Sequence, residues 1–186
     1  MSVGEKAASH ANPSDNRVAM TAKLETARLL LREMTEDDAE HLLALGRNPN
    51  VMRFIPGEPP VTSHDDALAV LRERVFPQYA MGLGRWACIV KSSGEFIGWC
   101  GVKHMPGDEY DVGYRFFEEH WGKGYATEAA RVVCEFAREH LRGKRVVGMA
   151  VHDNHASRRV LEKIGMAFEG EVESDGLRLA VYVLAV

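Results

Sequence analysis

Two glycines separated by one residue, Gly122 and Gly124, open a long segment of helical apolar periodicity in this 186-residue chain. A strand-like run, Tyr110–Phe117, comes directly before them. The first N–H groups of a helix have no partner within it and carry a partial positive charge. Glycines at that point let an anionic group approach the bare backbone. The order strand, glycine turn and helix therefore predicts a binding site for an anion, such as the diphosphate of a nucleotide-bearing cofactor.

The spacing of these glycines argues against two common nucleotide motifs. A P-loop has four residues between its glycines and then Gly-Lys-Ser/Thr, which Gly122-Lys123-Gly124-Tyr125 does not provide. The dinucleotide fingerprint G-x-G-x-x-G/A fails at its last position, where Thr127 stands. A tight turn that happens to contain two glycines is the alternative that this motif alone leaves open.

A second motif follows another strand-like run, Arg145–Val151, and reads Asn154-x-x-Ser-x-x-Val-Leu-Glu-Lys-x-Gly-Met166. Together with Trp121-Gly-Lys-Gly-Tyr-Ala-Thr-Glu-Ala129, it resembles the GNAT acetyltransferases. The similarity points to the branch with the ribosomal-protein N-terminal acetyltransferases of the RimJ/RimL type. The segment Leu24–Arg32 also resembles the first strand of that branch. The resemblance extends from about Leu24 to the C-terminus.

The order of the expected elements is that of an α+β protein. Helices mixed with a largely antiparallel sheet indicate a sandwich, and the GNAT fold is such a sandwich. We therefore expect a GNAT-type sandwich whose mixed, mostly antiparallel sheet has about six to seven strands, with helices on both faces. Strands are predicted at Ala27–Glu33, Arg85–Lys91, Glu95–Lys103, Glu109–Phe117, Arg145–Val151, Ala167–Glu173 and Leu177–Leu184, and helices near Thr35–Leu45, Thr62–Phe76, Gly124–Leu141 and Ala156–Ile164. The proline-rich segment Asn48–Pro60 is predicted to be a loop.

Length and composition set further limits. The length fits one domain, placed at residues 23–186, and residues 1–22 are expected to form a flexible tail because they have no apolar signal-peptide core. No apolar run approaches a membrane span. The net charge of −4 argues against a nucleic-acid partner and suits a cationic substrate. Three irregularly spaced cysteines indicate small core residues in a reducing compartment, hence the cytoplasm: Cys88, Cys100 and Cys134.

The resemblance implies acetyl-CoA as the co-substrate and gives its contacts. In the family, pantetheine lies in a gap beside the strand that ends here with Tyr114-Arg115-Phe116-Phe117, and the N–H groups of Phe116 and Tyr114 are expected to face it. Asn154 holds the pantetheine position of the family, with helix capping as its alternative role. The diphosphate is expected on the backbone amides of Trp121, Gly122, Lys123, Gly124, Tyr125 and Ala126. Because relatives often have Arg or Gln at the position of Trp121, that side-chain donor is lost here and Lys123 remains.

Acetyl transfer from a thioester to an amine requires a neutral amine, a stabilised oxyanion and a proton for the departing thiolate. The resemblance makes Ser157 the candidate acid, since the tyrosine that many relatives use four residues later is Leu161. Asp111 is the first candidate base because it matches an acidic position of the branch. The second candidates are alternating glutamates, expected on one strand face: Glu169, Glu171 and Glu173. A water relay to either would also serve.

The predicted function is that of an acetyl-CoA-dependent N-acetyltransferase. It would transfer the acetyl group directly to a primary amine, either a protein N-terminal α-amine or a small-molecule amine, and a homodimer is left open. No metal is expected, because the H-x-x-H of His152 and His155 overlaps the cofactor motif and lacks further ligand spacing. The alternatives are a non-catalytic acyl-CoA-binding or sensor module, kept open by Leu161, and a nucleotide-binding protein.

Overall fold

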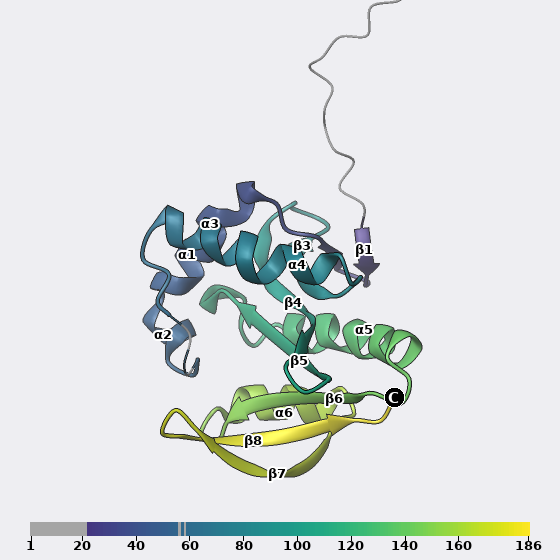
Figure 1. Cartoon of the computed structure of the whole chain (residues 1–186). Coiled ribbons are helices and arrows are strands. Elements are labelled where there is room, and N and C mark those ends of the chain that lie inside the picture. Colours follow the sequence, from purple (N-terminus) through teal and green to yellow (C-terminus); the bar gives the residue numbers. More distant parts are fainter. Residues whose placement is uncertain (1–21, 56, 58) are drawn as a thin grey trace, which may run out of the picture.

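The structure is a computed structural model that describes residues 22–55, 57 and 59–186. The predicted tail therefore lies outside the described residues, except for Ala22. Eight strands form one sheet in the order β1-β2-β3-β4-β5-β6-β8-β7 (Figure 1). The strands are β1 Ala22–Glu25, β2 Leu29–Arg32, β3 Gly84–Val90, β4 Phe96–Met105, β5 Glu109–Phe116, β6 Arg145–Val151, β7 Ala167–Ser174 and β8 Leu177–Leu184.

The sheet is mixed and mostly antiparallel, as predicted. Every neighbouring pair is antiparallel except β5 and β6, which are parallel. The strand beyond the predicted seven is β1. The helices are α1 Ala39–Arg47, α2 Pro49–Met52, α3 His64–Val70, α4 Phe76–Tyr79, α5 Tyr125–His140 and α6 His155–Lys163, with 3-10 turns at Glu36–Asp38 and Glu118–His120 and a π-helical segment at Leu71–Val75.

Helices cover both faces of the sheet, and the alternation of strand side chains explains how. Trp86 and the next residue, Ala87, point to opposite faces of β3. Trp86 belongs to the core under α5 and α6, whereas Ala87 belongs to the core under α1, α3 and the π-helical segment. Each face thus has its own hydrophobic core, which confirms the predicted sandwich (Figure 1).

Two predicted elements differ from the structure. The second helical segment continues through Pro77 to Tyr79, because Pro77 lies in the first turn of α4, where its missing N–H is not needed. The predicted loop contains α2, which begins at Pro49 and is capped by Asn48. The Asn48 side chain accepts hydrogen bonds from the two backbone amides that follow Pro49, so a proline-rich segment still forms one helical turn.

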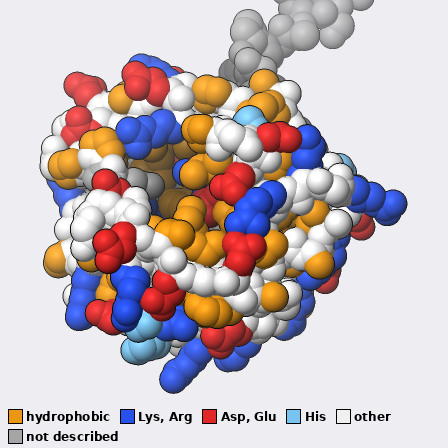
Figure 2. Space-filling view, turned by 60° about the horizontal axis from the view of Figure 1, so that its bottom comes forward, with side chains coloured by type: hydrophobic (Ala, Val, Ile, Leu, Met, Phe, Trp, Pro, Cys, Tyr) orange, Lys and Arg blue, Asp and Glu red, His pale blue; other side chains and the backbone are white. Residues whose placement is uncertain are grey.

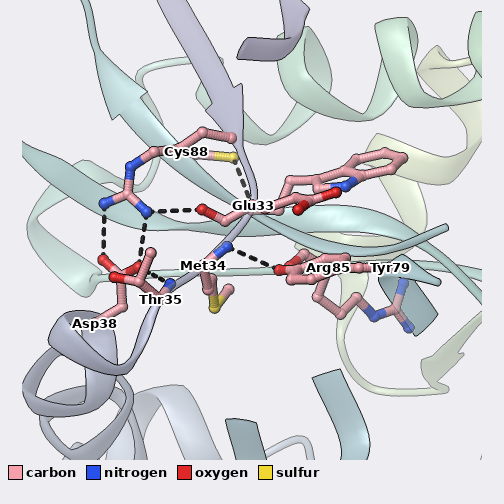
Figure 3. A network of polar contacts seen from close by, with 9 residues as sticks. Glu33, Met34, Thr35, Asp38, Tyr79, Arg85 and Cys88 are labelled. Atoms are coloured by element: carbon pink, nitrogen blue, oxygen red, sulfur yellow. Dashed lines mark hydrogen bonds and ion pairs between the residues drawn. The ribbon is translucent and has the colours of Figure 1, made fainter. Parts of the chain in front are cut away.

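A buried polar network connects the end of β2 to the neighbouring helices (Figure 3). Two guanidinium nitrogens of Arg32 donate to the Asp38 carboxylate at 2.7 and 2.8 Å, and both residues are buried. The Tyr79 hydroxyl accepts from the Met34 amide at 2.9 Å and donates to the Arg85 carbonyl at 2.7 Å. The start of α1 and the end of α4 are therefore fixed against β2 and β3.

The sheet opens between β5 and β6. The described pairing ends at Asp111 and Val147, after the pairs Glu109–Arg145, Tyr110–Val146 and Asp111–Val147. Beyond that point β5 continues to Phe116 against β4 only, and β6 continues to Val151 against β8 only. The carboxyl ends of two parallel strands therefore diverge, and we call the space between them the β5–β6 opening.

Candidate active site

The glycine loop, Trp121–Gly124, leaves its backbone exposed at the start of α5. Gly122 and Gly124 have φ of +73° and +81°, a left-handed conformation that favours glycine. A Cβ on Gly122 would meet no described atom within 4 Å, and one on Gly124 would meet only Nη2 of Arg28, at 3.5 Å. The N–H groups of the first turn of α5 are therefore open to a ligand at the helix end that favours anions.

The exposed edge of β5 lies next to this loop. The Phe117 amide donates to the Ile97 carbonyl of β4 at 3.0 Å. Because consecutive amides of a strand point to opposite edges, the N–H groups of Phe116 and Tyr114 face the β5–β6 opening. The Trp121 indole N–H donates to the Phe116 carbonyl at 2.9 Å and holds the glycine loop against the strand end. This bond thus places the glycine loop beside the end of the exposed strand edge.

The structure brings Tyr114 and Ser157 together from β5 and α6. The Tyr114 hydroxyl donates to the Ser157 carbonyl at 2.9 Å and lies 3.0 Å from Ser157 Oγ. Burial raises the pKa of Tyr114 well above its ordinary value, although the hydrogen bond with Ser157 acts in the opposite direction. The phenol is therefore protonated at neutral pH and can serve only as a neutral hydrogen-bonding group.

Asn154 caps α6. Its side-chain oxygen accepts from the Ser157 amide at 3.1 Å, which fixes the first turn of the helix and the place of Ser157. The alternative role considered for Asn154 is therefore present. A pantetheine contact of Asn154 stays a prediction.

Asp111 lies on the face of β5 opposite to Tyr114, in an ion pair with Arg85. The carboxylate contacts Nη2 of Arg85, and the two side chains are only 14 % and 12 % exposed. Arg85 Nη1 also donates to the carbonyls of Gly101 and Asp111, at 2.6 and 2.9 Å. A Cβ on Gly113 would lie 2.7 Å from this guanidinium, so Gly113 makes room for Arg85. This pairing competes with the predicted role of Asp111 as a base.

The three glutamates of β7 do not form one row. A β-bulge lies between Phe168 and Gly170 and breaks the period-two spacing at Glu169. Glu169 is held by Arg145, with contacts of 2.9 and 2.5 Å. Glu171 instead contacts His152 and Arg178, at 2.5 and 3.2 Å. The expectation that Glu169, Glu171 and Glu173 share one face is therefore wrong.

Two loops meet at the β7–β8 end of the molecule. A Cβ on Gly57 would lie 2.6 Å from Oδ2 of Asp175, which places the segment after α2 against the turn between β7 and β8. Figure 2 shows a hollow on this side of the molecule, with hydrophobic side chains in its wall and charged side chains at its rim. The contact brings together segments that are more than a hundred residues apart in the sequence.

The cysteines are core residues, as predicted. Cys88, Cys100 and Cys134 are free and buried. Burial raises the pKa of Cys88 and Cys100 and raises that of Cys134 to about 12, so none is a reactive thiolate. Within the described part of the chain, no group of three His, Cys, Asp or Glu is arranged for a metal ion. No helix there is both long and apolar enough to cross a bilayer.

Sequence reasoning missed Arg28 and Glu128, which connect the β1–β2 turn to the first turn of α5. Their side chains form an ion pair at 2.7 Å. A signal was present, because each lies in one of the motifs that carry the family resemblance and their charges are opposite. Nothing in the local sequence indicates, however, that two motifs a hundred residues apart touch.

Comparisons with known proteins agree with this geometry. The family model described as acetyltransferase (GNAT) domain matches residues 28–167. The N-acetyltransferase YoaA of Bacillus subtilis, itself uncharacterised, is 32 % identical over 151 residues, 79 % of this chain and 84 % of the relative. The FsC-acetyl coenzyme A-N(2)-transacetylase of Aspergillus fumigatus is 31 % identical over 153 residues, 77 % of this chain and 64 % of the relative.

Solved structures share the fold. A GNAT-family acetyltransferase from Bacillus anthracis superposes with a TM-score of 0.73 at 24 % identity, over 87 % of this chain and 96 % of that one. RimL, the ribosomal L7/L12 α-N-protein acetyltransferase, superposes with a TM-score of 0.74 at 16 % identity, over 90 % and 95 %. At these identities the likeness concerns the fold, so the RimJ/RimL branch stays a prediction.

The fold and the site define an acyltransferase that uses acetyl-CoA for acetylation. The chain belongs to the GNAT acetyltransferase family.

Proposed function

We propose that this enzyme moves the acetyl group of acetyl-CoA directly to a primary amine, with both substrates bound at once. The observation that carries the proposal is the β5–β6 opening beside the exposed glycine loop. An opening in the sheet gives a thioester access to main-chain donors, and the helix start beside it offers N–H groups to the diphosphate. No covalent acetyl-enzyme is required.

In this proposal the backbone of residues 121–126 binds the diphosphate, and Asn154 binds the pantetheine arm. The amides of Phe116 and Tyr114 face the opening, where they would polarise the thioester carbonyl and stabilise the oxyanion. The Trp121 indole supports the Phe116 segment by its bond to the carbonyl. Charge stabilisation thus comes mainly from the main chain, which accounts for Trp121 at a position where relatives often have a side-chain donor.

The amine nitrogen attacks the thioester carbonyl, a C–N bond forms, and the C–S bond breaks. The amine loses a proton and the departing thiolate gains one. We assign the second transfer to the Ser157 hydroxyl, whose place is fixed by Tyr114 and by the Asn154 cap. The hydroxyl regains a proton through water from the one that the amine releases, so the enzyme returns to its starting state. An α-amino group has an ordinary pKa of about 8 and is partly neutral at neutral pH. Such an acceptor needs no strong base, so water can accept its proton. Asp111 is not assigned this role because it is paired with Arg85.

We propose a protein N-terminal α-amine or a small-molecule amine as the acceptor. Two of the proteins compared above support an amine acceptor: RimL is named as an α-N-protein acetyltransferase, and the name of the FsC transacetylase places the transfer at a nitrogen, N(2). The converging loops at Gly57 and Asp175 are the proposed acceptor side. We further propose the cytoplasm as its location, supported by three free buried cysteines, and leave a homodimer open.

Release of free thiol from acetyl-CoA tests this function. A panel of acceptors should contain peptides with a free N-terminus, the same peptides with a blocked N-terminus, and polyamines and amino sugars. We expect thiol release with at least one free amine and an acetylated product of equal amount. Binding of CoA without transfer to any amine would favour the sensor module instead.

A further inference from the structure

The glycine loop is held at its first residue by the Trp121 indole, but its last residue, next to the helix, is a glycine. Gly124 is the residue that precedes α5, and it has no side chain to cap the helix. Two left-handed glycines one residue apart would leave the loop with much conformational freedom in isolation. Something outside the loop must therefore fix the amides that receive the diphosphate.

Arg28, from the turn between β1 and β2, contacts both sides of Gly124. Before the glycine, its Nη1 donates to the Lys123 carbonyl at 3.0 Å. After it, the guanidinium lies 4.3 Å from the centre of the Tyr125 ring. Its Nη2 would lie 3.5 Å from a Cβ added to Gly124. One planar group thus spans the loop and the first residue of the helix.

Glu128 holds this guanidinium in place. Its Oε2 accepts from Nε and Nη2 of Arg28, both at 2.7 Å. Its Oε1 accepts from the Arg28 backbone amide at 2.9 Å and from the Thr26 hydroxyl at 2.5 Å. The Glu128 amide in turn donates to the Gly124 carbonyl at 3.0 Å, the first hydrogen bond of α5. These contacts connect the β1–β2 turn to the first turn of α5 and, through Arg28, to the glycine loop. We call the set of Thr26, Arg28 and Glu128 the Arg28 clamp.

The charge of the clamp suits an anion site. A carboxylate in the first turn of a helix would repel a bound diphosphate unless a cation offsets it. Burial opposes ionisation of Glu128, but the hydrogen bonds from Thr26 and Arg28 outweigh it and lower its pKa. The clamp also forms part of the wall of an open groove of about 510 Å³ that reaches Gly124, whose other charged lining residues are Arg131 and Lys163 and the carboxylates Glu25 and Glu135.

We propose that Arg28 is a positioning residue for the co-substrate: its forked guanidinium holds the glycine loop in the conformation that binds the diphosphate of CoA. This inference rests on the proposed function. The Arg28 side chain is 45 % exposed, so its role lies in the loop rather than in the global stability of the fold.

The test compares CoA with pantetheine, which lacks the diphosphate, by calorimetric titration of the full chain. For Arg28→Ala we expect CoA affinity to fall about tenfold, the effect of losing one charge-assisted contact set, and pantetheine affinity to stay within about twofold. Arg28→Lys keeps the charge but not the fork, so it should bind CoA like the alanine variant. The matched control is Arg72→Ala, which removes an exposed Arg–Glu pair far from the loop and should change neither affinity.

A mutant cycle with Glu128→Ala adds a second readout. If the two residues act as one clamp, the double variant loses little more CoA affinity than either single variant. Additive losses, full rescue by lysine, or an equal fall in pantetheine affinity would each overturn the inference. Failure of the unmodified chain to bind CoA would instead overturn the proposed function, and this inference with it.

Discussion

The hydroxyl of Ser157 is placed by two neighbours, the Asn154 cap on its backbone and the Tyr114 phenol beside Oγ. We expect Ser157→Ala to lower kcat by about a hundredfold, the lower range for loss of a positioned proton donor. Tyr114→Phe should lower kcat by about tenfold, because it removes one hydrogen bond that orients the serine. Steady-state kinetics with the accepted amine measures both effects.

Both variants should bind CoA as the unmodified chain does, within about threefold, since the proposed diphosphate and oxyanion contacts are main-chain groups. The variant with both changes should be about as slow as Ser157→Ala alone, because Tyr114 is assigned a role only through Ser157. A further tenfold loss in the double variant would give Tyr114 an independent role and contradict this order.

A substitution in the Arg85–Asp111 pair tests whether the Asp111 carboxylate has a structural role or acts as the catalytic base. Asp111→Asn leaves a nearly buried guanidinium without its counter-charge, which should lower the free energy of unfolding by about 3 kcal/mol. The acidic limb of the pH profile of kcat/KM should stay in place, because Asp111 is paired with Arg85 and takes no part in the proposed proton transfers. A lost or displaced limb would identify Asp111 as the base. Asp108→Asn, on the exposed turn before β5, is the control and should change neither property.

At this scale the sequence indicated the main-chain sites better than the side-chain pairs. The glycine turn before α5 and the Asn154 cap were predictable because both depend on local conformation at the start of a helix, whereas their contacts with the co-substrate stay predictions. The partners of Asp111 and Glu128 were not, because each pair depends on the register between segments far apart in the sequence. The same limit explains why Tyr114 was assigned only a main-chain role, although its hydroxyl contacts Ser157.

Helix α5 has a left-handed glycine at each end, which allows the anion site to be separated from helix stability. Gly124→Val and Gly143→Val both place a branched side chain at positive φ, +81° and +74°, and each should cost about 1–2 kcal/mol. Only the first variant obstructs the glycine loop. We therefore expect it alone to lose detectable CoA binding, while circular dichroism shows both to be folded. Equal CoA affinity in the two variants would contradict the placement of the diphosphate.

Elements were predictable where one period dominates. The bounds of β6 and β8 are those predicted, since both are mostly apolar, β-branched segments that begin directly after turn residues. β1 was missed because a four-residue edge strand has too little pattern of its own. The bulge in β7 was also missed, since an inserted residue is defined by the partner strand and not by the sequence of β7. Both missed features, β1 and the bulge in β7, depend on pairing with a neighbouring strand.

In the described part of the chain, the parallel strand pair β5–β6 lies between two antiparallel parts of the sheet. β1–β5 form one part and β6–β8 the other, joined by three residue pairs and by α5. A ligand in the β5–β6 opening would contact both parts, so its binding should stabilise the complete fold and not a single loop. This connection makes global unfolding a suitable measure of ligand binding.

CoA and acetyl-CoA should therefore raise the unfolding temperature of the full chain. A ligand at a hundred times its Kd adds about 2.7 kcal/mol, which for a chain of this length corresponds to about 5–10 °C. ATP has a triphosphate and NAD a diphosphate, but neither has a pantetheine arm to fill the opening, so we expect shifts of at most about 1–2 °C at the same concentration. The Gly124→Val variant serves as the control and should show no shift with any of the four. A shift with ATP or NAD as large as that with CoA would mean that the glycine loop binds diphosphates without help from the opening, and the link between sheet geometry and acetyl transfer would fail.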